Sequence, residues 1–177
     1  MKQAITLAEA VPLKGIISRH IQELIRERND VAFVEAEKGE EYEKPLRSVE
    51  KITEELERVR KDFRMLDILI NKANLENTIC WDEENISIKE AIELAKQLRE
   101  EANRLKSLGN AKKIERTSRG LLNNHLVLLR IAQFEPEEYR KRGIKLERQV
   151  NKLSALIEHA NHFVTIEFDD TKYAGEE

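Results

Sequence analysis

Apolar residues recur at heptad spacing over residues 52–73, and this spacing restricts the possible folds more than any other feature of the chain. The successive steps are 4, 3, 4, 3, 4 and 3 residues, and the positions are Ile52, Leu56, Val59, Phe63, Leu66, Ile70 and Ala73. This is the a/d pattern of a coiled coil, and it predicts a helix over about 46–74 that Pro45 opens and Asn74 ends. A helix of that length, roughly 40 Å, needs an antiparallel neighbour or another chain to cover its stripe. The first six positions are therefore candidates for an oligomer seam.

Three further helices are predicted. The first covers about 7–29, where Pro12 and Gly15 delay its regular part until after Leu13 or kink it. Another starts at the capping-box pattern of Ser87 and reaches Gly109, and the last covers about 135–161. Strand candidates are residues 75–81, 126–134 and 163–168, and residues 35–45 read as an exposed acidic loop. The expected fold class is mainly α: an elongated antiparallel helical bundle or coiled coil of about four long helices with two or three short β-strands.

Seven residues of the second predicted helix and strand recur 87 positions later in the chain. They are Leu66, Leu69, Ile70, Ala73, Asn74, Thr78 and Ile79, which return as Leu153, Leu156, Ile157, Ala160, Asn161, Thr165 and Ile166. We interpret residues 1–168 as a single helical domain with an internal repeat, about 46–81 and 133–168, whose two strands lie close together. The alternative is that helices ending in Asn are common. Residues 169–177 read as an acidic, flexible tail.

Composition excludes several classes of protein. The 34 acidic residues outnumber the 31 basic ones only slightly, so the net charge of −3 gives no global attraction to nucleic acid or to a membrane. The single cysteine forms neither an intramolecular disulfide nor a zinc site alone. No stretch approaches the roughly 18 apolar residues of a spanning helix, and no signal-peptide pattern opens the chain. We expect a cytoplasmic protein that does not interact with membranes.

Two basic segments could bind anions. The denser one carries Lys112, Lys113, Arg116 and Arg119, and the second covers residues 140–148. Such clusters bind phosphates with a steep salt dependence, so a nucleic acid or another polyanion is one possible partner. The alternative is a solvated face that pairs with the acids of 35–43 or 54–57, in the same chain or in a partner.

His159 and His162 are three residues apart, so they share a helical face and could bind Zn²⁺ if a carboxylate or a third histidine joined them. Histidines near a helix C-terminus also stabilise its dipole, which explains the pair without a metal. The chain has no nucleophile elbow, Walker loop or dinucleotide-binding glycine pattern. We therefore expect no cofactor and no catalytic residue.

The chain resembles a small bacterial family of unknown function whose members are sometimes labelled septicolysin. The resemblance covers roughly 7–168 and rests on scattered residues. These are Leu7-Ala8-Glu9-Ala10, Asn29, Gly39-Glu40, Leu66, Ala73-Asn74, Thr78, Ser87, the basic segment before 126–134, Leu153, Ile157, Ala160-Asn161 and Thr165. The chain departs from the family at His162, where members have Trp, and at Glu84-Asn85-Ile86, where they have a Gly-Arg-Thr-like turn. The resemblance implies a helical, oligomer-prone fold and no established activity.

Three functional hypotheses follow from the sequence. The first is a structural or interaction protein that self-associates through its heptad seam as a homo-oligomer. The second is a nucleic-acid or polyanion binder that uses segments 112–119 and 140–148. The third is a metal-dependent enzyme built on the two histidines. No pattern names a small-molecule ligand.

Overall fold

The structure is a computed structural model that describes residues 3–39, 41–116 and 128–173, and it is mainly helical. The helices are α1 (Leu7–Asp30), α2 (Val49–Glu76), α3 (Ile88–Gly109) and α4 (Pro136–Phe163). The strands are β1 (Gln3–Thr6), β2 (Thr78–Trp81), β3 (Glu84–Ser87), β4 (Ile114–Arg116), β5 (Leu129–Ile131) and β6 (Thr165–Phe168). The prediction of a mainly α fold with short strands is confirmed, and the described residues hold six strands where two or three were expected.

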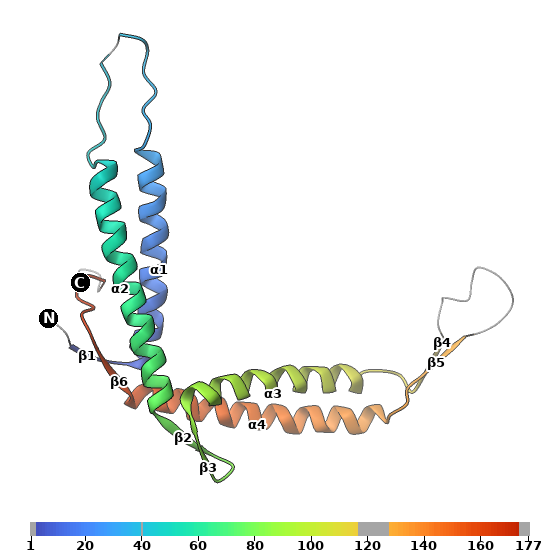
Figure 1. Ribbon diagram of the computed structural model, residues 1–177. Helices are drawn as coiled ribbons and strands as arrows, with labels where there is room; N and C mark the ends of the chain where they lie inside the picture. Colours follow the sequence, from blue (N-terminus) through green and yellow to red (C-terminus); the bar gives the residue numbers. More distant parts are fainter. Residues whose placement is uncertain (1–2, 40, 117–127, 174–177) are drawn as a thin grey trace. The chain divides into compact units, whose positions relative to one another are not determined.

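The chain divides into two compact units. The first holds the residues up to Thr78 together with those from His159 onward, and the second holds Ile79–Glu158. In the first unit α1 and α2 lie side by side and antiparallel, and the loop that joins them lies at the end opposite β1 and β6 (Figure 1). In the second unit α3 and α4 form a comparable antiparallel pair (Figure 1).

Large aliphatic side chains hold the α1/α2 pair together. On α2 the predicted stripe is buried, with Ile52, Leu56 and Leu66 completely inaccessible and Phe63 half-buried. The buried partners on α1 are Leu7, Ala10, Leu13, Ile17 and Leu24. The neighbour that the stripe requires is thus α1 of the same chain. A contact between chains would need other residues, and the homo-oligomer stays a prediction.

Side-chain caps fix the start of α1, which lies at the predicted residue, and the start of α2, which lies elsewhere than predicted. The α1 helix begins at Leu7 and not after Leu13, because the Thr6 hydroxyl accepts a hydrogen bond from the Glu9 N–H while the Glu9 carboxylate accepts one from the Thr6 N–H. Pro12 lies exposed inside this helix. The α2 helix begins at Val49, three residues later than predicted, because Ser48 caps its first turn.

The prediction that Asn74 ends α2 is wrong. The helix continues to Glu76, and Asn77, in an extended conformation, donates its backbone N–H to the Ala73 carbonyl. Asn74 is instead 8% exposed, and its Oδ1 is buried without a hydrogen-bond partner among the described residues. Asn74 is therefore a buried residue within α2 and not the residue that caps its end.

Small residues make up much of the contact in the α3/α4 pair, beside the large buried side chains of Ile88, Val150 and Leu153. Ala91, Ala95 and Ala102 are buried on α3, and Gly143 is buried on α4. A Cβ atom added to Gly143 would lie 3.0 Å from the backbone nitrogen of Lys106 on α3. One added at Gly109 would lie 2.6 Å from the backbone of Arg140 on α4. The two backbones approach more closely here than large side chains would allow.

The described residues form three two-stranded sheets, and the order of the elements that they connect shows the repeat. Every bound of α2 and β2 lies 87 positions before the corresponding bound of α4 and β6. The strands of the two segments, which we expected to lie together, pair with other strands instead: β6 with β1, and β2 with β3. A two-residue turn with positive φ at Asp82 and Glu83 folds β3 back onto β2, which explains this pairing.

The first strand and helix of each half also correspond. The bounds of β3 lie 81 positions after those of β1, and each strand ends in a hydroxyl residue, Thr6 or Ser87, that caps the helix after it. The chain is therefore a strand–helix–helix–strand motif used twice. In both sheets of this motif the first strand of one half pairs with the last strand of the other half: β1 with β6, and β3 with β2.

Candidate interaction surface

A two-stranded arm, β4 with β5, extends from the end of the α3/α4 pair (Figure 1). The strands are antiparallel, with Ile114 opposite Ile131 and Arg116 opposite Leu129. All six strand residues are exposed, including Ile114 at 58%, Leu129 at 51% and Ile131 at 52%. An isolated hairpin is at best marginally stable in water, because it has little to bury its apolar side chains against. The arm is thus an apolar surface without a covering layer among the described residues.

Unpaired cations surround these apolar side chains. Within the described part of the chain, no ion pair involves Lys112, Arg116 or Arg130. Lys113, by contrast, donates to the Phe134 carbonyl and pairs with Glu135. Lys112 and Arg130 also line a hollow of about 600 Å³ at the base of the arm. Three of the predicted anion-binding residues, Lys112, Lys113 and Arg116, therefore lie at or next to the arm, whereas Arg119 lies outside the described residues.

Two of the five cations in the second basic segment, residues 140–148, contact their own neighbours. Arg140 donates two hydrogen bonds, of 2.8 and 2.7 Å, to the Glu137 carboxylate, and this contact raises the pKa of the Arg140 guanidinium. The Arg142 guanidinium lies 5.4 Å from the centre of the Tyr139 ring. These contacts leave fewer free cations on α4 than the sequence suggests.

The loop between α1 and α2 carries the opposite charge. Residues 31–48 contain five glutamates and three basic residues, and one of the three, Arg47, pairs with Glu27 of α1 and Glu55 of α2. Phe33 is 88% exposed in this loop. Tyr42 and Leu46 are exposed as well. The α1/α2 loop and the β4–β5 arm occupy corresponding places in the two halves of the repeat. The loop is acidic and the arm is basic, and both expose apolar side chains.

His159 and His162 belong to no metal-binding cluster within the described ranges of the chain. Among the described residues, no group of three or more His, Cys, Asp or Glu side chains is close enough to hold a metal ion. The His159 ring packs on Phe163 at 4.6 Å between centres, and His162 lies near Glu9, where its charge contributes to lowering the pKa of that carboxyl. The main causes of that lowering are the hydrogen bonds from Thr6. Both histidines thus lie in the last turns of α4, and their role in metal binding stays a prediction.

A polar cluster in the first unit was missed by the sequence analysis. The Tyr173 hydroxyl donates to Asp62 at 2.9 Å, and Lys172 pairs with the same carboxylate at 3.2 Å. His20 lies 3.7 Å from Glu55, and together these groups line a cavity of about 220 Å³. No sequence pattern could reveal the contact, because Asp62 and Tyr173 are 111 positions apart. Part of the segment expected to be a flexible tail thus contacts α2.

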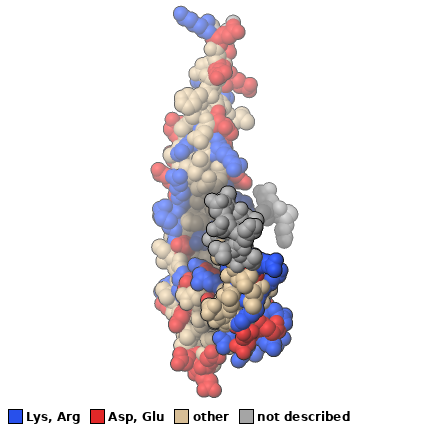
Figure 2. All heavy atoms as spheres, turned by 90° about the vertical axis from the view of Figure 1, so that its right-hand side faces the viewer, with Lys and Arg blue, Asp and Glu red and all other residues tan. Residues whose placement is uncertain are grey.

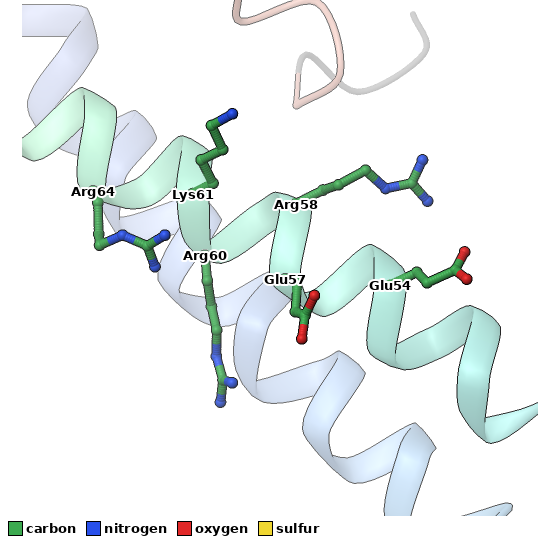
Figure 3. Close-up of a pocket in the computed structure, with 6 residues that line it drawn as sticks. All are labelled: Glu54, Glu57, Arg58, Arg60, Lys61 and Arg64. Atoms are coloured by element: carbon green, nitrogen blue, oxygen red, sulfur yellow. The ribbon is translucent and has the colours of Figure 1, made fainter.

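Figure 3 shows a third charged surface, a shallow hollow formed by one face of α2. It is lined by Glu54, Glu57, Arg58, Arg60, Lys61 and Arg64. All six side chains come from a single helix and extend from it without converging on a common point (Figure 3). Acidic and basic side chains are also interspersed over the face drawn in Figure 2. Such a surface is typical of a solvated helix face, and we assign it no ligand.

Comparisons with known proteins support the fold without naming a function. A crystal structure of a functionally unknown conserved protein from Corynebacterium diphtheriae is similar, with a TM-score of 0.68 and 21% sequence identity. The match covers 93% of this chain and 99% of that one. No family model matches the chain, and no curated protein does either. The resemblance to the family labelled septicolysin therefore stays a prediction. None of the described helices combines the length and apolar composition needed to cross a membrane.

Proposed function

We propose that the protein is a structural or interaction protein that self-associates through its β4–β5 arm. The observation that carries this proposal is the exposure of every described strand residue of the arm, three of them large aliphatic side chains. A second copy of the chain is the favoured occupant, because the chain itself holds an exposed loop of opposite charge.

The predicted seam plays no part in this proposal, since α1 covers it within the chain. The alternative, a nucleic-acid or polyanion binder, has less support because Lys113 and Arg140 are engaged with acidic neighbours. A metal-dependent enzyme has no support from the described residues.

Sedimentation equilibrium over a concentration series tests the proposal. Wild-type protein is expected to show a mass above that of one chain. Replacing Ile114, Leu129 and Ile131 together by Thr should return the mass to that of the monomer. Threonine removes apolar surface but retains a preference for strands.

The matched control removes exposed apolar residues from the outer face of α2. Ile68 is 64% exposed and Leu75 is 61% exposed, so Ile68→Gln with Leu75→Gln removes comparable surface. This variant should associate like wild type. A wild-type protein that stays monomeric at every concentration, or a control that dissociates while the arm variant does not, would contradict the proposal.

A further inference from the structure

We propose that the β4–β5 arm of one copy binds the acidic loop, residues 31–48, of a second copy. The inference rests on the proposed self-association and names the surface that receives the arm. It makes the contact heterologous, because two different surfaces meet, so two copies can close a pair through two such contacts or continue into a chain.

Charge favours this pairing over the contact of two like surfaces. The described residues of the arm and its flanks, 110–116 and 128–135, include four basic and two acidic ones, whereas those of the loop, 31–39 and 41–48, include four acidic and three basic ones. Arg47 is held by Glu27 and Glu55, which leaves the rest of the loop more acidic. Contact between two arms would bring together two surfaces that each carry Lys112, Arg116 and Arg130. Repulsion between charges of the same sign disfavours such a contact.

Apolar side chains supply the attraction that charge alone would not. Phe33 and Leu46 stand almost fully exposed in the loop, and Ile114, Leu129 and Ile131 are about half exposed on the arm. Aromatic and aliphatic anchors surrounded by charged residues are the usual composition of a specific interface. In the proposed contact, the exposed apolar side chains of the loop and those of the arm cover each other.

The backbone of the loop also suits the arm. Residues 33–37 and 41–45 belong to no helix or strand, and Gly39, with φ of 96°, turns the chain between them. In a two-stranded sheet each strand has one unpaired edge, where an extended segment of another chain can add as a further strand. The loop therefore provides the kind of segment that such an edge accepts.

Complementary charge reversal tests the pairing. The loop variant carries Glu35→Lys, Glu37→Lys, Glu41→Lys and Glu43→Lys, and the arm variant carries Lys112→Glu, Arg116→Glu and Arg130→Glu. Each variant alone should self-associate at least about tenfold more weakly than wild type, because its two surfaces then have the same sign. An equal mixture of the two should regain wild-type affinity. Sedimentation velocity measures all three, and circular dichroism confirms that each variant is helical.

The matched control reverses three cations on the face of α2 in Figure 3: Arg60→Glu, Lys61→Glu and Arg64→Glu. It changes the net charge as much as the arm variant does, and it should associate like wild type. The inference is overturned if the mixture fails to regain affinity, or if the control weakens association as much as the arm variant.

These outcomes separate the inference from the proposed function. If the Thr variant of the arm dissociates while charge reversal changes nothing, self-association stands and the acidic loop is not its partner. If wild type is monomeric, both the proposed self-association and the pairing of the arm with the acidic loop are wrong. If monomeric wild type binds heparin or duplex DNA and the arm variant does not, polyanion binding replaces both.

Discussion

The α1/α2 and α3/α4 pairs use the same order of elements but different side chains to hold their helices together. Leu, Ile and Val fill the space between α1 and α2, whereas Ala and Gly line much of the contact between α3 and α4. A large side chain contributes by the apolar area that it removes from water. A small one contributes by letting two backbones approach, so that dispersion contacts replace solvent. The same motif thus tolerates two kinds of core.

This difference makes the two pairs sensitive to opposite changes. Removing volume should destabilise α1/α2 most, because its large side chains leave cavities. Adding volume should destabilise α3/α4 most, because its backbones leave no room. The predictions below test this contrast, beginning with the largest expected effect.

Leu66→Ala should lower the free energy of unfolding by about 2–5 kcal/mol, because Leu66 is completely buried and its loss leaves a cavity. Urea unfolding followed by circular dichroism measures the change. Ile68→Ala, two residues further along α2 and 64% exposed, is the control and should change stability by less than about 0.5 kcal/mol. Equal effects at the two positions would show that α1 does not cover the stripe.

Gly143→Ala should destabilise the protein by about 1–3 kcal/mol, because the new Cβ would lie 2.9 Å from the Lys106 side chain and 3.0 Å from its backbone nitrogen. Gly15→Ala on α1 is the reverse case, with no atom within 4 Å of the added Cβ. It should stabilise the helix by about 0.5–1 kcal/mol, since alanine loses less backbone entropy than glycine. Thermal unfolding of both variants decides the matter, and a gain in stability at Gly143 would remove the contrast between the pairs.

Thr6→Ala and Ser87→Ala compare the caps at corresponding places in the two halves. Each should cost about 1 kcal/mol, with Thr6 the more costly, because its hydroxyl also donates to the Glu9 carboxylate at 2.8 Å, a bond that Thr6→Ala removes. The hydrogen bond from the Thr6 N–H, and then the one from its hydroxyl, lower the pKa of Glu9 below its ordinary value of 4.5, so the contribution of the hydroxyl bond is present above pH 4.5 and is lost as the pH falls through the lowered value. The difference between the two variants in urea unfolding should therefore shrink in acid. A difference that grows in acid would contradict this account.

The smallest effect concerns Tyr173. Burial, and then its hydrogen bond to Asp62, raise the pKa of the Tyr173 phenol above its ordinary value of 10.0. Since the neutral phenol is the form that the fold favours, this contact contributes fully below pH 10 and is lost as the pH rises through the raised pKa. Ultraviolet absorbance titration should show a late-ionising tyrosine in wild type that is absent from Tyr173→Phe. A titration unchanged by the substitution would contradict the contact.

Local patterns predicted most of the helices correctly. The heptad steps placed α2, the capping pattern placed the start of α3 at Ser87, and the offset of 87 matched the bounds of two further elements. These features depend on neighbours along the chain, which a sequence displays directly. The correspondence of Thr6 and Ser87 was also readable, since each precedes a glutamate by three positions.

The errors arose where distant or competing contacts decide the structure. A reciprocal cap makes α1 helical from Leu7 onward, as its predicted bounds had it, so the delay of its regular part that Pro12 suggested does not occur. Asn74 is buried by its surroundings and does not end its helix. The candidate surface was half predicted: Lys112 and Arg116 were identified and Arg130 was not, and the position of these cations beside exposed Ile114 and Leu129 follows from the pairing of β4 with β5. The contact of Tyr173 with Asp62 had no local signal at all.

The exchange of closing strands has a consequence for engineering. Cleavage of the chain between Asp82 and Glu83 would separate β2 from β3 and β1 from β6, so each fragment would keep a helix pair and lose the partner of every strand it retains in those two sheets. Neither fragment could complete its sheets alone, and the two together could. The turn at these residues is therefore a natural place to build a split reporter, whose halves regain their fold only on meeting.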